Sequence, residues 1–316
     1  MGILNSYARR LKLSALTLGA LKHPNARIEK LSHRFLTYED FRFHRVVARG
    51  KRERVSGVGV SEDLLTAQAT AIMECLERDH YYANPKRPTT NGMSCSTKKV
   101  QARLASLLEL VERDQLLLTI FYSPTWKVLA PQTRPSITYF YMTHDLPIHV
   151  VMAEIKWGVE ERCYGFGCSF DIIRAKDKAL REAILLYDSR SVPVPVPEIR
   201  GNVWHMLPFI NPSAASPQLP PCDPRQRTME PVAENSLLQC SLPELQRAMD
   251  EKGLDVTYEY SEHKVFPFLS LVICQAISST MQDLFFSDSQ IQINALRTEG
   301  LGYSSNPRYS VLHPIG

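Results

Sequence analysis

The chain has 316 residues, of which 44% are hydrophobic and 22% charged, a composition that is ordinary for one large or two smaller globular domains. A net charge of +4 does not by itself indicate nucleic-acid binding, and no apolar run reaches the roughly 18–20 residues that a membrane span needs. The seven cysteines are odd in number and scattered, which favours reduced thiols over a disulfide framework. We therefore expect a cytoplasmic protein without a nucleic-acid or membrane partner.

Residues 1–44 are expected to form a basic helix and a lead-in to the main domain. No acidic residue precedes Glu29, whereas several bases do, among them Arg9, Arg10 and Lys12. A transit peptide would have a similar composition, but a basic first helix is the interpretation that we favour. The run Phe41–Arg49, FRFHRVVAR, then has the pattern of a strand.

The stretch Val55–Tyr82, VSGVGVSEDLLTAQATAIMECLERDHYY, is predicted to begin with a glycine-rich turn and to continue as a helix. Apolar residues recur at i, i+4, i+7 and i+11, which predicts a buried stripe of Leu65, Ala69, Ile72 and Leu76. The opposite face carries polar, aromatic and charged side chains, namely Thr70, Glu74, Glu77, Arg78 and Tyr81. A solvated surface is one interpretation of that face, since exposed ion pairs are common and weak.

An internal repeat favours a functional interpretation instead. GVGVS at Gly57–Ser61 returns as GFGCS at Gly165–Ser169, and the register continues at a constant offset (165 − 57 = 108), so that Glu74 corresponds to Glu182. Glu182 again lies opposite an apolar stripe, which is formed by Ile173, Leu180, Ile184 and Tyr187. We therefore predict a duplicated strand–turn–helix unit whose two polar helix faces are turned into one cleft.

The remaining patterns predict an α+β fold with antiparallel sheets flanked by helices. Lys98–Glu112, KKVQARLASLLELVE, is an amphipathic helix that we expect to pack in the core. Val265–Ile277, VFPFLSLVICQAI, is expected to be a buried strand. Ser191–Pro224 is a proline-dense insertion, in which VPVPVP is expected to be extended because proline donates no backbone hydrogen bond.

The chemistry of the repeated glutamates suggests a site for magnesium-bound phosphates. Glutamates that converge from two helices are hard oxygen ligands, and Arg78 beside them is suited to phosphate. The sequence contains no GxxxxGK[ST] loop, no complete dinucleotide fingerprint and no GxSxG elbow. His144, His149 and His205 are candidate general bases, although a lone histidine is more often structural.

Several of these segments resemble motifs of the YcaO superfamily. SGVGVSEDLLTAQATAIMECLERD is similar to its helical ATP-site motif, and GFGCSFDIIRAKDKALREAILLYDSR resembles the motif that follows. Thr138–Ile155 looks like the strand pair of the family, Leu242–Tyr260 like its late helix–strand unit, and the ending VLHPIG like the tail of its peptide cyclodehydratases. We take residues 45–316 as one YcaO-like domain that contains the proline-rich insertion at 191–224.

The resemblance implies ATP-dependent activation of backbone amides in a ribosomally made precursor peptide. In that family a nucleophile adds to the amide carbon and the amide oxygen is phosphorylated. A neighbouring cysteine, serine or threonine gives an azoline, and an external sulfur source gives a thioamide, often during maturation of bacteriocins. Carried over by position, Glu74, Glu77 and Arg78 would hold Mg2+ and ATP, and Glu182 would join the two glutamates as a metal ligand. The partners implied are the precursor peptide and a leader-binding protein, and a homodimer is a further alternative.

The sequence departs from the family pattern at several positions. Residues 1–50 contain nothing like the early block with a further pair of glutamates that such enzymes usually carry. Leu185 stands where a glutamine is typical, and Thr66 and Arg174 stand where acids are expected. A catalytically degenerate scaffold or regulatory subunit of a peptide-modifying complex is therefore the alternative function.

The last five residues, Leu312–Gly316, suggest a catalytic role for the tail. Pro314 restricts the backbone of the residue before it, so this ending is stiffer than its length implies. We expect the tail to lie beside the ATP site, where His313 or the terminal carboxylate would help proton transfer at the activated amide.

Overall fold

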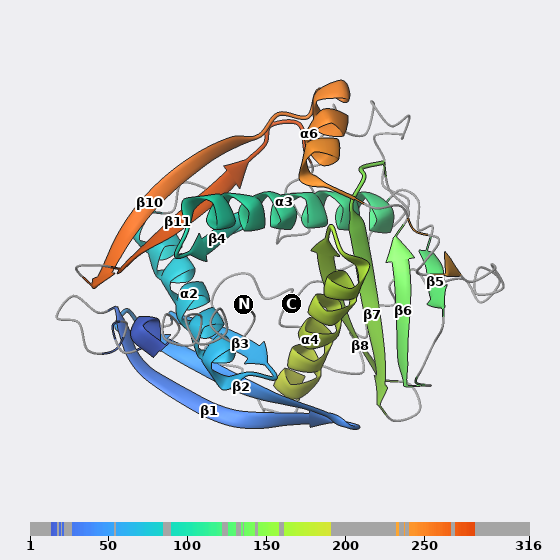
Figure 1. Cartoon of the computed structure of the whole chain (residues 1–316). Coiled ribbons are helices and arrows are strands. Elements are labelled where there is room, and N and C mark those ends of the chain that lie inside the picture. The colour runs from blue at the N-terminus through green and yellow to red at the C-terminus, as the bar shows by residue number, and fades with distance from the viewer. Residues whose placement is uncertain are drawn as a thin grey trace, which may run out of the picture. The chain divides into compact units, whose positions relative to one another are not determined.

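A computed structural model of the chain (Figure 1) describes residues 14–17, 19, 21, 27–53, 55–84, 90–121, 126–130, 134, 136–142, 145–157, 161–190, 232–233, 237, 240–266 and 269–281. The chain divides into two compact units. Unit 1 consists of residues 1–107 and 257–277, and unit 2 of residues 108–256 and 278–316. Among the helices of the described segments, none is long and apolar enough to cross a membrane.

Unit 1 contains two antiparallel sheets and the helix α2 (Leu64–Ala83). The first sheet has the order β1-β2-β3 and is formed by Ile28–Tyr38, Phe41–Gly50 and Ser56–Ser61. The second has the order β10-β11-β4 and is formed by Thr257–Phe266, Leu269–Ile277 and Met93–Ser96. The helix α3 (Lys99–Phe121) begins in unit 1 and continues into unit 2.

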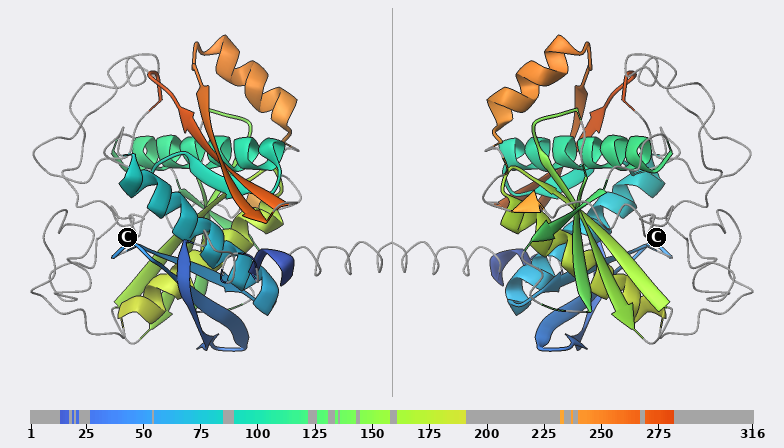
Figure 2. Two further views of the ribbon diagram at one scale, coloured as in Figure 1. Left: turned by 90° about the vertical axis from the view of Figure 1, so that its left-hand side faces the viewer. Right: turned by 90° about the vertical axis from the view of Figure 1, so that its right-hand side faces the viewer.

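Unit 2 is built on a five-stranded sheet with the order β8-β7-β6-β5-β9. Its strands are β5 (Trp126–Ala130), β6 (Ile137–Met142), β7 (His149–Trp157), β8 (Glu161–Ser169) and β9 (Val232–Ala233). The pairing is antiparallel except between β5 and β9. The helix α4 (Ile172–Arg190) packs against β7 and β8 (Figure 2), and α6 (Leu242–Glu251) follows later in the chain. Together the two units confirm the predicted α+β class with antiparallel sheets and flanking helices.

The repeated glycines lie in strands, so the expected glycine-rich turn is wrong. Gly59 is in the middle of β3, and Gly167 is at the equivalent position of β8. A Cβ atom at Gly59 would come closer than 3.0 Å to the carbonyl oxygen of Ala67 on α2, and one at Gly167 would come as close to that of Ala175 on α4. Glycine is therefore needed because each helix backbone lies almost directly on its strand.

The real turn follows the glycines and is also duplicated. The Ser61 hydroxyl accepts a hydrogen bond from the Asp63 N–H at 3.2 Å, and Asp63 then caps α2 by accepting the N–H three residues later at 2.9 Å. In unit 2 the Ser169 hydroxyl accepts from the Asp171 N–H at 3.2 Å, and Asp171 accepts an N–H of the first turn of α4 at 2.9 Å. Such side-chain caps satisfy N–H groups that have no partner inside the helix.

The helix faces follow the predicted periodicity with three exceptions. In α2 the predicted stripe is buried apart from Leu65, which is half-buried. In α4 Tyr187 is half-buried and Ile173 is 68% exposed. A second stripe, of small residues, was not predicted, and it lies against the strand glycines: Ala67, Ala71 and Cys75 in α2, and Ala175, Ala179 and Ala183 in α4. Ile173 comes before the first alanine of this stripe and is exposed to solvent.

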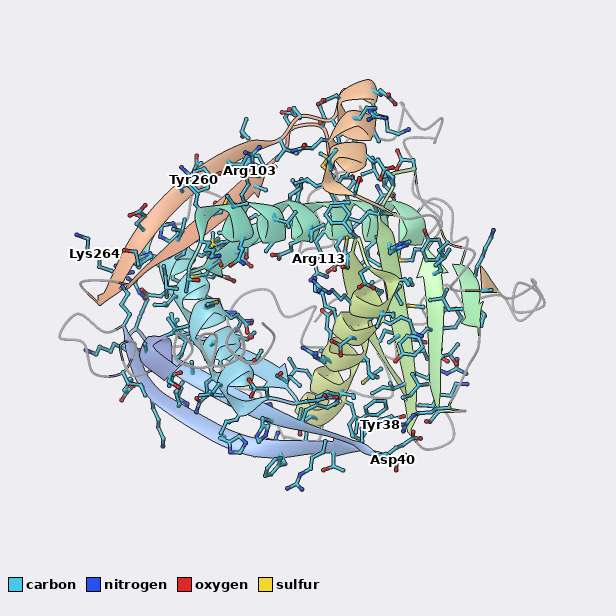
Figure 3. All side chains as sticks on the ribbon, in the orientation of Figure 1. Tyr38, Asp40, Arg103, Arg113, Tyr260 and Lys264 are labelled. Carbon is cyan, nitrogen blue, oxygen red and sulfur yellow. The ribbon has the colours of Figure 1, made fainter. Side chains whose placement is uncertain are left out.

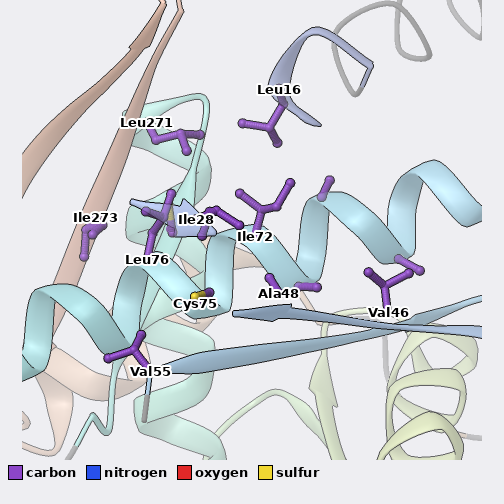
Figure 4. Close-up of a cluster of buried hydrophobic side chains, with 14 of the residues drawn as sticks. Leu16, Ile28, Val46, Ala48, Val55, Ile72, Cys75, Leu76, Leu271 and Ile273 are labelled. Carbon is purple, nitrogen blue, oxygen red and sulfur yellow. The ribbon is translucent and has the colours of Figure 1, made fainter. Parts of the chain in front are cut away.

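The core of unit 1 surrounds α2. Figure 4 shows Ile72 on the side of α2 that faces Leu16, and both side chains are fully buried. The same cluster includes Val46 and Ala48 from β2 and Ile273 from β11. Because burial of an aliphatic side chain contributes about 1.5–3 kcal/mol, these contacts hold α2 firmly against both sheets of the unit.

One further prediction is wrong, and two others fall outside the described residues. The expected single strand Val265–Ile277 is wrong at its beginning, because β10 ends at Phe266 and β11 starts at Leu269 as its antiparallel partner. The proline-dense insertion Ser191–Pro224 lies outside the described residues, as do Arg9, Arg10 and Lys12 of the expected first helix.

Candidate functional site

Glu74 on α2 has both carboxylate oxygens engaged within unit 1. Oε2 accepts a hydrogen bond from the backbone N–H of Val58 on β3 at 2.6 Å, and Oε1 lies 2.5 Å from Nη2 of Arg78. Arg78 also donates from Nη1 to the carbonyl oxygen of Ser56 at 2.9 Å. The side chains of Glu74 and Arg78 are 29% and 44% exposed. The pair is thus fixed by backbone groups of β3 while both side chains remain open to solvent.

Glu77 is held by the other sheet of unit 1. Its Oε1 accepts a hydrogen bond from the backbone N–H of Cys95 on β4 at 2.5 Å. Burial and, to a smaller extent, the Glu77 charge raise the pKa of the Cys95 thiol well above its ordinary value. Cys95 is therefore an uncharged core residue, and the backbone hydrogen bond orients the Glu77 carboxylate.

Asp79 is a third acidic residue of α2 with fixed partners. Asp79 is buried, and its two oxygens accept hydrogen bonds from Arg27 at 2.7 Å and Arg52 at 3.1 Å. Each of the charged residues Glu74, Glu77 and Asp79 is thus tied to a different partner segment of unit 1. Fixed side chains of this kind can bind a ligand without first losing rotamer freedom.

Glu182 on α4 belongs to unit 2 and repeats the contact of Glu74. Its Oε2 accepts a hydrogen bond from the backbone N–H of Phe166 on β8 at 2.7 Å, and Phe166 corresponds to Val58 in the repeat. In both units the bond spans 16 residues. The repeated glutamate therefore has one structural task in each unit, which is to connect its helix to the preceding strand.

Unit 2 also contains a partly buried charge cluster that the sequence patterns did not predict. It is formed by Glu112 and Arg113 on α3 with Lys178 and Glu182 on α4. The Glu112 side chain is fully buried and lies 2.7 Å from Nζ of Lys178. Nη2 of Arg113 lies 3.6 Å from Glu112 and 3.9 Å from Glu182. Figure 3 shows Arg113 extending from α3 on the side of α4.

Burial and charge shift the pKa values of this cluster in opposite directions. Burial would raise the pKa of Glu112, but the charges of Lys178 and Arg113 outweigh it and the pKa is lowered. For Glu182 and for the nearby Glu109, burial outweighs the positive charges, so the pKa of Glu182 is raised and that of Glu109 reaches about 7. A signal was present in the sequence, since polar residues interrupt the otherwise apolar run LLELVERDQLLL at five positions: Glu109, Glu112, Arg113, Asp114 and Gln115.

The candidate histidines do not join these groups within the described residues. His149 on β7 is buried, and burial lowers the pKa of its imidazole, which is typical of a structural histidine. His144, His205 and His313 lie outside the described residues.

The charged residues of α2 are of the kinds that a protein uses to hold a magnesium ion and the phosphates bound to it. In the described part of the chain, no three His, Cys, Asp or Glu side chains are arranged to enclose a metal ion. Magnesium commonly uses only one or two protein carboxylates and takes its other ligands from water and phosphate. Glu74 and Glu77 provide two such carboxylates on one helix, with the guanidinium of Arg78 beside them.

A protein-family model matches residues 79–258, more than half of the chain, and its description is YcaO cyclodehydratase, ATP- and Mg2+-binding. The chain belongs to the YcaO cyclodehydratase family. The predicted resemblance is thereby confirmed, and ATP and Mg2+ are the cofactors of the family. The matched range includes Glu182 but begins one residue after Arg78. No curated protein matches the sequence.

Solved structures of the family have the same fold. YcaO from Methanopyrus kandleri, bound with AMPPCP and Mg2+, matches with a TM-score of 0.64 and 16% identity over 86% of this chain and 90% of that one. The E. coli microcin synthetase McbBCD complex matches with a TM-score of 0.63 and 12% identity over 83% and 90%. A heterocyclase in complex with substrate and cofactor matches with a TM-score of 0.63 and 14% identity over 94% of this chain and 56% of that one.

Proposed function

We propose that this YcaO protein uses ATP and Mg2+ to activate backbone amides of a ribosomally made precursor peptide, forming an azoline or a thioamide. Membership of the YcaO cyclodehydratase family supports the reaction class. Structural relatives that are a microcin synthetase complex and a heterocyclase with its substrate support a peptide as the substrate and a partner protein in the complex. Maturation of a bacteriocin or similar peptide is the setting that we favour.

The observation that carries the proposal is the fixed charged row on α2. The N–H groups of Val58 and Cys95 orient Glu74 and Glu77 from two different sheets of unit 1. These N–H groups occupy one lone pair of each carboxylate, and a carboxylate has about four acceptor positions, so further ligands are compatible with both bonds. We assign Glu74 and Glu77 to Mg2+ and Arg78 to the phosphates.

Each residue of the row has a distinct task in this proposal. The carboxylates of Glu74 and Glu77 would hold the metal ion, whose charge would offset that of the phosphates. Arg78 would donate two parallel hydrogen bonds to phosphate oxygens, as a planar guanidinium can. Bound MgATP would supply the phosphoryl group that turns an amide oxygen into a leaving group. The third predicted ligand, Glu182, belongs to the other unit and stays a prediction.

The test is Mg2+-dependent binding of ATP by calorimetry, with Glu77→Gln as the main variant. The amide can still accept the Cys95 N–H, so the fold should persist while the charge that attracts the metal is lost. We expect ATP affinity to fall by roughly tenfold or more in the variant, which is about 1.4 kcal/mol. Glu62→Gln, at an exposed position before α2, is the control and should bind ATP as the wild type does. Equal affinity of wild type and Glu77→Gln would contradict the assignment.

A catalytically degenerate subunit of a peptide-modifying complex is the second candidate. It is favoured by the ion pair between Glu74 and Arg78, because each group already neutralises the other. A degenerate subunit would not bind MgATP in the titration but would still co-purify with a precursor peptide or a leader-binding protein.

The proposed role of His313 in the tail is tested separately by truncation after Val311, since this segment lies outside the described residues.

A further inference from the structure

A cavity of about 460 Å³ lies in unit 1 at the C-terminal end of α2. One wall is the last turn of α2 with its capping residue, and the other is the sheet β10-β11-β4. Its volume is in the range of sites that bind small molecules or side chains of a partner. Glu74, Glu77 and Arg78 do not line it, so the proposed MgATP site does not use this cavity.

The lining combines an apolar floor with polar groups that can bind a ligand. Met93 and Ile273 are buried and belong to the core cluster that surrounds α2. Glu259 is the only acidic residue of the lining. The side-chain amides of Asn84 and Gln275 form no hydrogen bond with another described residue. A side chain with an apolar stem and a cationic end matches this combination, because such a chain can bury its stem and keep its charge at a polar rim.

The cavity extends to the edge of the sheet. Three consecutive residues of β10, Glu259, Tyr260 and Ser261, line it, although neighbouring side chains of a strand point to opposite faces. Glu259 and Ser261 share the cavity face with their partners on β11. The Tyr260 side chain is on the other face, where Nζ of Lys99 lies 4.1 Å from the centroid of its ring. Tyr260 therefore reaches the cavity through its main chain.

The main-chain groups of Tyr260 are directed away from the sheet. The N–H of Ala276 on β11 donates to the carbonyl oxygen of Gly92, beside β4, at 2.8 Å. Because successive residues of a strand alternate in direction, the N–H and C=O of Gln275 point to β10, where Glu259 is the partner. Those of the next residue, Tyr260, then point outward. Among the described strands only β11 pairs with β10 (Figure 1), so the outward groups of Tyr260 can accept a further strand.

We propose that an extended segment of the precursor peptide adds to the edge of β10 as a further strand and places a lysine or arginine side chain in the cavity. Main-chain hydrogen bonds to Tyr260 hold the peptide, and the cavity selects the side chain. The stem of that side chain lies on Met93 and Ile273, and its charged end meets Glu259. The choice of the precursor peptide as the occupant rests on the proposed function, whereas the strand pairing and the charge preference do not.

The first experiment determines which peptides the full chain binds in the absence of nucleotide. A display library of random linear heptapeptides is selected against wild type, Glu259→Lys and Glu262→Lys. Glu262 is the matched control, because it is also exposed on β10 but its side chain is on the same face as that of Tyr260. We expect wild type and Glu262→Lys to enrich lysine or arginine at one position by roughly fivefold or more. Glu259→Lys should enrich aspartate or glutamate there instead.

The result that contradicts the proposal is equally specific. Selection of no peptide by the wild type, or the same charge preference in wild type and Glu259→Lys, would overturn it.

The second experiment tests the addition of a strand. A selected peptide is labelled with fluorescein and titrated by anisotropy with wild type, Tyr260→Pro and Tyr260→Ala. Proline removes only the outward N–H and is tolerated on edge strands, so no hydrogen bond to β11 is lost. We expect Tyr260→Pro to bind roughly tenfold more weakly or worse, and Tyr260→Ala, which keeps the N–H, to stay within about threefold of the wild type. Equal binding by the two variants would overturn the proposal.

A second probe replaces Tyr260→Pro if that variant does not fold. The wild type is titrated with two versions of the peptide that are N-methylated at alternate residues. Only one version should bind more weakly, because every second N–H of an added strand points to its partner. Equal effects of the two versions would overturn the proposal.

These measurements can fail independently of the proposed function, because no nucleotide is present. A wild type that binds MgATP but selects no peptide would contradict the strand site alone. A wild type that selects basic peptides but does not bind MgATP would contradict the proposed function and leave the strand site supported.

Discussion

The Glu182 carboxylate accepts a hydrogen bond of 2.7 Å from the backbone N–H of Phe166. The equivalent bond joins Glu74 to Val58 at 2.6 Å, one repeat length earlier in the chain. Each glutamate therefore supplies an acceptor to the N–H of a strand residue that lies between two glycines. At those glycines the helix backbone is so close that a side chain larger than hydrogen would overlap it. The first prediction follows from this contact.

Glu182→Ala should destabilise the protein by about 1–3 kcal/mol, because the partly buried Phe166 N–H loses its acceptor. Glu182→Gln retains an acceptor oxygen and should cost less than half as much. Urea unfolding of both variants, followed by circular dichroism, gives the comparison. Equal losses in the two variants would mean that the charge near Arg113, and not the backbone contact, is the main contribution of Glu182.

Gly59→Ala should destabilise unit 1 by about 1–3 kcal/mol or more, because its methyl group would overlap the backbone of α2. Gly253→Ala is a matched control. Its Cβ would meet nothing within 4 Å, and its positive φ of 64° alone should cost about 1 kcal/mol. Urea midpoints of the two variants provide the measurement. A smaller loss for Gly59→Ala than for the control would show that α2 can move away from β3.

Stability should fall as the pH decreases from about 6.5 toward 4 because of His263. Burial, followed by the charges of Arg27 and His80, lowers its pKa to about 4, while the carboxylate of Asp79 opposes this shift. The unfolded state has the ordinary pKa of about 6.5 and binds the proton first, so acidification favours unfolding throughout this window. The slope from this one group is at most about 1.4 kcal/mol per pH unit.

The measurement for His263 is urea unfolding of wild type and His263→Gln between pH 4 and 7.5. The variant should lose stability less steeply than the wild type below pH 6.5 and match its slope above pH 7. His33→Gln, an exposed substitution on β1, is the control. Parallel curves for wild type and His263→Gln would exclude His263 as the source of the pH dependence.

Arg78→Lys should weaken MgATP binding by roughly tenfold without loss of stability. Lysine keeps the positive charge but cannot donate two parallel hydrogen bonds from a planar group. The side chain is 44% exposed, so the fold does not depend strongly on its packing. Calorimetric titration with MgATP, alongside Arg49→Lys on β2 as an exposed control, provides the check. Unchanged affinity would remove Arg78 from the phosphate site.

Patterns along the chain were enough to predict the two repeated helices, the polar face of α2 and the duplication of the strand–helix unit. Periodicity and self-similarity are properties that can be read from residue order, so the charged row of Glu74, Glu77 and Arg78 was visible without coordinates. The same information placed Glu182 in the second copy and indicated the family through its motifs. It also predicted the α+β class, because the duplicated unit was expected to form antiparallel sheet with helices packed against it.

The contacts of the repeated residues, in contrast, depend on how the chain folds. The glycines were predicted as a turn because glycine favours turns in general, but the close approach of α2 to β3 depends on where the helix lies and not on local preference. Glu112 and Lys178 are 66 residues apart, and no pattern along the chain indicates that they meet. Whether a carboxylate is a metal ligand or half of an internal ion pair depends on such distant neighbours, since the strength of an electrostatic interaction is set by distance in space.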